Sequence, residues 1–163
     1  MNKSNYYDEI SAGYDELHEA EQLKKIAIIK SKIKLSRNSN SLDVGCGTGI
    51  STKELGCRVG VDPSRKLIEI AEHKYPKITF LQANAEALPF DDWEFDYVFS
   101  ITAIQNFNDI EQGLREIMRV GNNYVLTFLK RSEKREKIDM LIRKIFHVKE
   151  MIEEDKDLIY FCI

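Results

Sequence analysis

Two spacings of hydrophobic residues alternate along the chain. Short apolar runs of roughly four to eight residues, bounded by polar or glycine-containing turns, are typical of buried strands. Between them lie segments with apolar residues three and four positions apart, such as Leu23, Ile26 and Ile33, which is typical of helices. Strands are predicted at 41–44, 57–61, 78–81, 95–100, 124–129, 148–152 and 157–163, and helices at 19–35, 48–55, 65–74, 109–120 and 131–146.

The alternation of strands with helices predicts an α/β fold, in which a parallel sheet carries helices on both faces. The last two strands are joined by the short acidic turn 153–156, so we expect them to form an antiparallel hairpin. Ser64 and Asp109 precede two of the predicted helices and are expected to cap them. A length of 163 residues fits a single domain over 1–163.

Composition indicates the cellular compartment and excludes some classes of partner, but it does not indicate a function. A net charge of -3 gives no general attraction to nucleic acid. No apolar run approaches the roughly 18 residues of a membrane-spanning helix, and the first residues lack the apolar core of a secretory signal. Cys46, Cys57 and Cys162 show no C-x-x-C spacing, so neither a disulfide nor a metal site is expected. These features favour a cytoplasmic protein that does not contact a membrane.

A glycine-rich turn follows the first predicted strand. Gly45, Gly47 and Gly49 stand at alternate positions and lead into a helix, so the backbone and the free N–H groups of that helix can approach a ligand closely. The dinucleotide-binding pattern G-x-G-x-x-G is not met, because Ile50 stands where its third glycine would be. The phosphate loop of NTPases is not met either, because no lysine occurs in the turn before Lys53.

Two carboxylates flank this turn. Asp43 precedes the first glycine by two residues; a carboxylate there repels a pyrophosphate and attracts a cation. Asp62 follows the second strand, directly before Pro63 and Ser64, where a carboxylate can accept hydrogen bonds from both hydroxyls of a ribose. A positively charged, adenosine-like ligand fits this pattern, and S-adenosylmethionine (SAM) is such a ligand.

The stretch Asp-Val-Gly-Cys-Gly-Thr-Gly at 43–49 resembles motif I of the class I SAM-dependent methyltransferases. Among these, the chain is most similar in character to the small "type 11" enzymes of ubiquinone and menaquinone synthesis. The resemblance implies a Rossmann-like, mostly parallel seven-stranded sheet of order 3-2-1-4-5-7-6 with strand 7 antiparallel. It also implies SAM as cofactor, S-adenosyl-L-homocysteine (SAH) as product, and a site across the carboxyl ends of strands 1, 2 and 4.

Two further stretches resemble the same family with departures. Residues 82–90 resemble a family segment in which an Asp accepts a hydrogen bond from the adenine amino group and the next backbone N–H donates to the adenine ring. In this chain, these roles fall on Asn84 and Ala85. Asn84 keeps an acceptor but loses the assistance of a charge. Glu86 is expected in the first turn of a helix. After the fourth strand, Gln105 occupies a position where His is common, so we expect no general base there.

Residues 5–18 resemble an opening segment that folds over the cofactor in many small methyltransferases, and 1–20 is therefore expected to act as a lid. Its tyrosines Tyr6 and Tyr14 either contact the cofactor or only pack. No catalytic side chain is assigned. The implied cofactor-binding set is Tyr6, Tyr14, Asp43, Gly45, Cys46, Gly47, Asp62, Pro63, Asn84, Ala85, Ser100 and Gln105.

The resemblance specifies the cofactor better than the methyl acceptor. The helix 109–120 matches the family, whereas the loop that usually follows is reduced to 121–123. The basic helix 131–146 is either an ordinary solvated face or an RNA-facing patch.

Three functions stay open at this point. The first is methyl transfer by in-line displacement to an unidentified small molecule. The second is transfer to tRNA or protein with a small activator subunit, because 101–109 and the N-terminal segment resemble archaeal relatives of tRNA wobble-base methyltransferases. The third is an inactive SAM-binding scaffold.

Overall fold

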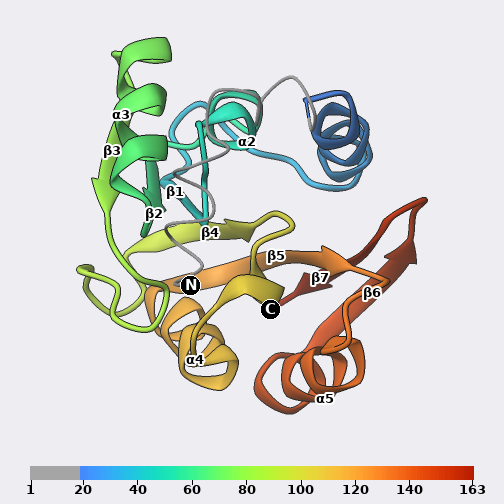
Figure 1. Ribbon diagram of the computed structural model, residues 1–163. Coiled ribbons are helices and arrows are strands. Elements are labelled where there is room, and N and C mark those ends of the chain that lie inside the picture. Colours follow the sequence, from blue (N-terminus) through green and yellow to red (C-terminus); the bar gives the residue numbers. More distant parts are fainter. Residues whose placement is uncertain (1–18) are drawn as a thin grey trace.

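The computed structural model describes residues 19–163, which form a seven-stranded sheet between two layers of helices (Figure 1). A helix at 19–32 comes first in this part of the chain. The elements that follow are β1 (Ser41–Val44), α2 (Ile50–Glu54), β2 (Val59–Asp62), α3 (Arg65–Lys74), β3 (Thr79–Gln82), β4 (Phe95–Ser100), the 3-10 helix η1 (Ile104–Asn106), α4 (Ile110–Val120), β5 (Gly121–Leu129), α5 (Arg135–Ile145), β6 (Val148–Glu153) and β7 (Asp157–Cys162).

The strand order is β3-β2-β1-β4-β5-β7-β6, which confirms the expected topology. Strands β1 to β5 pair in parallel, and β7 pairs antiparallel with both β5 and β6, as expected for the last hairpin. The direction of the winding reverses between β1 and β4. Connections that leave these two strands diverge to opposite faces of the sheet, and this divergence opens a crevice at their carboxyl ends.

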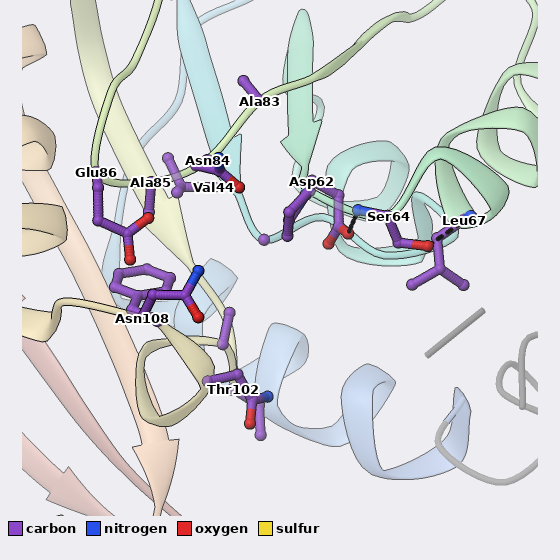
Figure 2. A pocket seen from close by; sticks show the side chains of 15 residues that line it. Val44, Asp62, Ser64, Leu67, Ala83, Asn84, Ala85, Glu86, Thr102 and Asn108 are labelled. Carbon is purple, nitrogen blue, oxygen red and sulfur yellow. Dashed lines mark hydrogen bonds between the residues drawn. The ribbon is translucent and has the colours of Figure 1, made fainter. Parts of the chain in front are cut away.

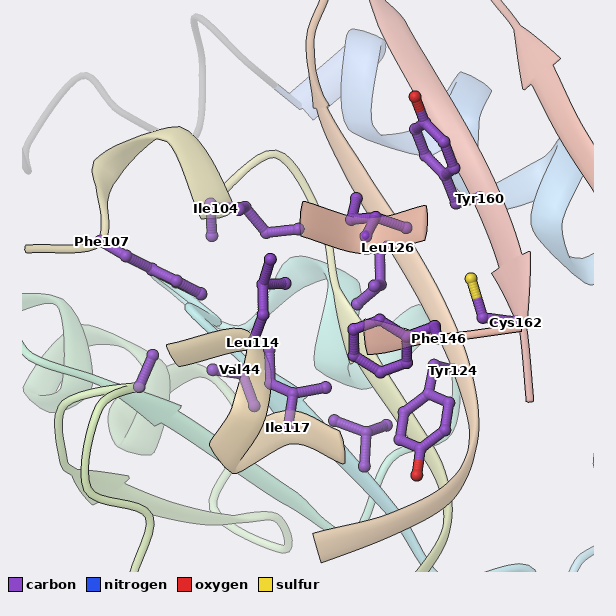
Figure 3. Close-up of a cluster of buried hydrophobic side chains, with 14 of the residues drawn as sticks. Val44, Ile104, Phe107, Leu114, Ile117, Tyr124, Leu126, Phe146, Tyr160 and Cys162 are labelled. Atoms are coloured by element: carbon purple, nitrogen blue, oxygen red, sulfur yellow. The ribbon is translucent and has the colours of Figure 1, made fainter. Parts of the chain in front are cut away.

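Alternate residues of the strands supply two cores, one on each face of the sheet. On one face, Leu42 and Val98 pack with α4 and α5, and Figure 3 shows the aliphatic and aromatic side chains of that cluster. On the other face, Phe99 packs against the helix at 19–32. Figure 1 shows that helix and α2 on the side of the sheet opposite to α4 and α5. The same alternation turns Asp43 away from Leu42, toward α2.

The predicted loop 121–123 is wrong, because β5 begins at Gly121 directly after α4. The family usually has a loop at this point, but here the side chains of Asn122 and Asn123 bond across to the neighbouring strand. Asn122 Nδ2 donates to the carbonyl of Phe95 at 2.9 Å, and Asn123 Nδ2 donates to that of Asp96 at 3.0 Å. These bonds hold the amino end of β5 against β4.

Two helix starts also differ from expectation. Glu86 lies in a turn and not in a helix, and α5 begins at Arg135 rather than at 131 because Ser132 forms a turn. Ser64 and Asp109 do cap their helices, accepting from the N–H groups of the third residue beyond each. Within residues 19–163, no helix has both the length and the apolar character needed to cross a membrane.

Candidate functional site

A pocket lies at the carboxyl ends of β1, β2 and β4, with roughly 660 Å³ of empty space that includes open solvent. Figure 2 shows Asp62 and Ser64 from the end of β2, Asn84 and Glu86 from the loop after β3, and Thr102 from the segment after β4. The lining residues are Val44, Gly45, Asp62, Pro63, Ser64, Leu67, Ala83, Asn84, Ala85, Glu86, Thr102, Ala103, Asn106, Phe107 and Asn108.

The glycine turn needs its first glycine for two reasons. Gly45 has a φ of 79°, a backbone conformation that side chains disfavour. A Cβ at this position would lie 2.4 Å from the Cβ of Ala103, which is closer than any real contact. The turn is fixed to the next strand, since the N–H groups of Gly45 and Cys46 both donate to the carbonyl of Val61 at 2.8 and 2.9 Å. The turn and the segment after β4 therefore meet at the base of the pocket.

Asp62 joins the glycine turn to the next helix. Its Oδ2 accepts from the N–H of Gly47 at 3.0 Å, and its Oδ1 accepts from the N–H of Ser64 at 2.9 Å. The residue is 8% exposed and lines the pocket. A carboxylate has about four lone-pair positions, so these two bonds do not exhaust its capacity to accept. Asp62 is thus a rigid acceptor at the end of β2.

Asp43 lies behind the glycine turn and does not line the pocket. Ser51 Oγ and Thr52 Oγ1 donate to its Oδ2 at 2.5 and 2.9 Å, whereas its buried Oδ1 has no hydrogen-bond partner. Burial raises the pKa of this carboxyl to about 6; the two hydroxyl bonds oppose the rise and the charge of Asp62 adds to it. A buried carboxylate with an unpartnered oxygen favours a positive charge in the neighbouring pocket.

The thiol of Cys46 is also buried and lies outside the pocket lining. Burial, followed by the charges of Asp62 and Asp43, raises the pKa of Cys46 well above its usual range. The thiol therefore stays neutral, which excludes it as a nucleophile at neutral pH. It packs with Ile68 and Phe80, between the glycine turn and α3.

The loop that carries Asn84 and Ala85 is fastened to α4. Glu86 Oε1 accepts from the N–H of Asp109 at 2.9 Å, and this bond holds the loop against the start of the helix. Farther along, Arg119 donates to the carbonyls of residues 88 and 90, and Glu116 accepts from the N–H of residue 88. The bond to the Arg119 guanidinium lowers the pKa of Glu116. These contacts give the polar end of the pocket a fixed backbone.

Ser100 and Gln105 stabilise the segment after β4 and do not line the pocket. The hydroxyl of Ser100, which is fully buried, donates to the carbonyl of Val44 at 2.9 Å and so links β4 to β1. Gln105 Nε2 donates to the carbonyl of Thr102 at 2.9 Å, within the turn that leads into η1. Lys134 Nζ in turn donates to the carbonyl of Gln105 at 3.1 Å.

The structure thus brings five of the predicted site residues together in the pocket lining, and it places five others behind that lining. Tyr6 and Tyr14 lie outside the described residues, and cofactor contact stays a prediction for the whole set. In the lining are Gly45, Asp62, Pro63, Asn84 and Ala85; behind it are Asp43, Cys46, Gly47, Ser100 and Gln105.

Sequence reasoning missed several residues of the wall after β4. Thr102, Ala103, Asn106 and Phe107 line the pocket, although the segment 101–107 had suggested only Gln105. Ala103, Asn106 and Phe107 belong to or flank the 3-10 helix η1, and the motif comparison did not specify which side chains of this segment line the pocket. Asn108, just before the helix cap, is a polar lining residue that no motif in the chain indicated.

Comparisons with known proteins agree with this geometry. The family described as "Methyltransferase domain" matches residues 42–124. The chain is 36% identical over 129 residues to demethylmenaquinone methyltransferase of Chlorobaculum tepidum, covering 71% of this chain and 53% of that protein. It is also 36% identical over 122 residues to an uncharacterised protein of Methanocaldococcus jannaschii, covering 74% and 47%. The chain spans about half the length of these relatives.

The fold has a match over nearly its whole length among solved structures. A chain in the complex between the Haloferax volcanii Trm112 methyltransferase activator and a methyltransferase superposes with a TM-score of 0.82 at 16% identity. That match covers 100% of this chain and 98% of the other. Together, the family match, the glycine turn and the order of the strands show that this chain belongs to the class I SAM-dependent methyltransferases, whose cofactor is S-adenosylmethionine.

Proposed function

We propose that this chain is itself a SAM-dependent methyltransferase, with its cofactor site in the pocket at the carboxyl ends of β1, β2 and β4. The observation that carries the proposal is the placement of Asp62 in the pocket wall, held by the backbone of the glycine turn. A fixed carboxylate at this point accepts from ribose hydroxyls. The negative charge of Asp43 behind the glycine turn disfavours a pyrophosphate, so the two carboxylates together favour a nucleoside over a dinucleotide.

The remaining lining fits the rest of the cofactor. The side-chain carbonyl of Asn84 is an acceptor for an adenine amino group, and the N–H of Ala85 is a donor for the ring. Gly45 leaves the space that a Cβ would fill, and the negative charge of Asp43 behind the turn favours the sulfonium and ammonium groups. When bound, SAM supplies a methyl group on a positively charged sulfur.

The chain's own contribution to this chemistry is alignment. Among the described residues that line the pocket, Asp62 and Glu86 have the ionisable side chains, and Glu86 is engaged with the N–H of Asp109. Asp62 is likewise engaged with the N–H groups of Gly47 and Ser64, so we propose no general base among the lining residues. Orientation of two reactants alone supplies roughly 7–11 kcal/mol of a reaction barrier, which suits a displacement whose leaving group is already activated.

Calorimetric titration of the purified protein with SAM, SAH and NAD tests the assignment. We expect SAM and SAH to bind and NAD not to bind. Asp62→Ala should weaken the binding of SAM and of SAH by about tenfold or more, because the ribose hydroxyls lose their acceptor. Asp91→Ala, which removes an exposed carboxylate, is the matched control and should leave both affinities unchanged. Binding of NAD in place of SAM, or unchanged affinity in Asp62→Ala, would contradict the proposal.

The acceptor is addressed by a second experiment. The protein is incubated with tritiated SAM and a cell extract, which is then separated into RNA, protein and small-molecule fractions. The relative from Chlorobaculum tepidum is named demethylmenaquinone methyltransferase, and we propose a small molecule as the acceptor here. Label in RNA or protein would favour the macromolecular alternative, and SAM binding with no label in any fraction would favour the scaffold.

We propose further that a small activator subunit can complete the enzyme. The support is the superposition with a chain from the Trm112 complex over the full length of both chains. Co-purification of tagged protein from a native extract should then retain a small partner, and adding it should raise methyl transfer. Equal transfer rates with and without the partner would refute this second proposal.

A further inference from the structure

The wall of the pocket after β4 depends on a strained residue. Thr102 lies directly beyond the strand and has a φ of 55°, in the left-handed region of the backbone. A β-branched residue rarely adopts this conformation, because its Cβ is crowded by the backbone. Such outliers persist only where their surroundings hold them, and they concentrate at functional sites. Thr102 lines the pocket, so the strain lies at the site itself.

A buried polar cluster holds this residue. Thr102 Oγ1 accepts from Lys25 Nζ at 2.6 Å and donates to Asp157 Oδ2 at 2.7 Å. The N–H of Thr102 donates to Thr127 Oγ1 at 2.8 Å, and that hydroxyl donates to the same oxygen of Asp157 at 2.9 Å. The helix at 19–32, the end of β5 and the start of β7 therefore converge on one residue.

The cluster contains an ion pair that is costly to bury. Lys25 is 3% exposed, Asp157 is 0% exposed, and their charged atoms lie 3.2 Å apart. Moving both charges out of water is expensive, so a buried pair is a weak source of stability. Asp157 Oδ1 is buried without a hydrogen-bond partner, which adds to the cost. An arrangement so costly suggests a role beyond stability.

The turn at Thr102 determines where the next residues lie. Ala103 follows it and packs so closely on the glycine turn that a Cβ at Gly45 would lie 2.4 Å away. Figure 2 shows Thr102 across the pocket from Asn84, beside the helix that carries Lys25. If adenosine lies along Asp62 and Asn84, the rest of the cofactor extends toward this wall.

We infer that Lys25 and Asp157 are positioning residues, which hold Thr102 in its left-handed conformation and so shape the pocket for the methionine portion of the cofactor. The inference rests on the proposed function, because it concerns the same pocket. A positioning role and a purely structural role predict different results. If the cluster positions the wall after β4, its loss should weaken the binding of ligands that reach this wall and leave unchanged the binding of ligands that end at the ribose.

Calorimetry with SAH and with adenosine tests this on Lys25→Met and Asp157→Asn. We expect SAH to bind about tenfold more weakly or worse, a loss of about 1.4 kcal/mol, while adenosine affinity stays within about threefold. Lys32→Met, which removes an exposed ion pair with Glu150 from the same helix, is the control and should change neither affinity. Equal losses for both ligands, or a loss for neither, would overturn the inference.

Substitutions at Thr102 leave no buried charge unpaired, so they keep the test valid if the charge variants fail to fold. Thr102→Val keeps the shape, the strain and the backbone bond to Thr127, but it removes the hydroxyl's bonds to Lys25 and Asp157. It should weaken SAH binding by about tenfold. Thr102→Gly accepts a positive φ without strain and should weaken it by a smaller factor. If Thr102→Gly loses as much SAH affinity as Thr102→Val, the hydroxyl itself contacts the ligand, and the positioning role is overturned. Unchanged SAH binding in Thr102→Val would also overturn it. Failure of the unsubstituted protein to bind SAH would instead refute the proposed function.

Discussion

Protonation of Asp43 should stabilise the ligand-free protein, contrary to the usual behaviour of carboxylates. Its pKa is raised from 3.8 to about 6, chiefly by burial. A rise of roughly two pKa units means that keeping the carboxylate ionised in the folded protein costs about 3 kcal/mol at neutral pH. The unpartnered Oδ1 explains why the two hydroxyl bonds on the other oxygen do not offset the burial.

The direction in which stability changes with pH follows from the order of the folded and unfolded pKa values of Asp43. Because the folded pKa lies above the unfolded one, the folded state binds the proton more tightly between about pH 4 and pH 6. The free energy of unfolding should therefore rise as the pH falls from 7 to 5, by about 1.3 kcal/mol from this group. For a chain of this size that corresponds to about 3–5 °C in Tm. Glu116, with a lowered pKa, loses its contribution only at more acidic pH.

Urea denaturation followed by circular dichroism at pH 7, 6 and 5 measures the effect. Asp43→Asn is the comparison, because its amide carbonyl can still accept from Ser51 and Thr52 while its charge is gone. The unfolding free energy of the native protein should gain about 1.3 kcal/mol relative to the variant between pH 7 and pH 5. Parallel pH dependences of the two proteins would refute the assignment of a raised pKa to Asp43.

Two further predictions concern other residues of the pocket. Asn84→Asp restores the carboxylate that is usual in the family, and SAM should bind a few-fold more tightly by calorimetry because a charged acceptor forms the stronger bond; equal or weaker binding would argue that Asn84 does not meet the adenine amine. Gly45→Ala should destabilise the fold by at least about 1 kcal/mol more than Gly56→Ala in thermal unfolding, since both have positive φ but only Gly45 faces a clash, with Ala103. Similar losses in the two variants would contradict the close approach of the glycine turn to that wall.

The parts of the site that sequence could predict are those fixed by local chemistry. Gly45 and Asp62 are specified by a turn and a strand end that lie close together in the chain, and both line the pocket. The place of Asp43 behind the turn follows from the alternation of a strand, which turns it away from Leu42 and Val44. A motif match carries no such information about direction.

The parts that sequence could not predict depend on contacts between distant segments. Lys25, Thr102 and Asp157 lie in three separate segments of the chain, and no spacing relates them. A loop was expected at 121–123 because the family usually has one after this helix, yet the side chains of Asn122 and Asn123 bond across to β4. Tertiary partners decided the structure in both cases.

The acidic residues around the pocket share one use, which is to hold neighbouring segments of the chain in place. Asp62 holds the glycine turn, Glu86 holds the start of α4, Asp157 holds Thr102, and Asp43 accepts from two hydroxyls of α2. A general base must lie within hydrogen-bond reach of the proton it takes from the acceptor, whereas these carboxylates are bonded to the protein's own N–H and hydroxyl groups. Methyl transfer from a sulfonium requires accurate alignment instead, because the leaving group is already activated. The arrangement of these carboxylates therefore fits an enzyme that acts by holding two reactants in line.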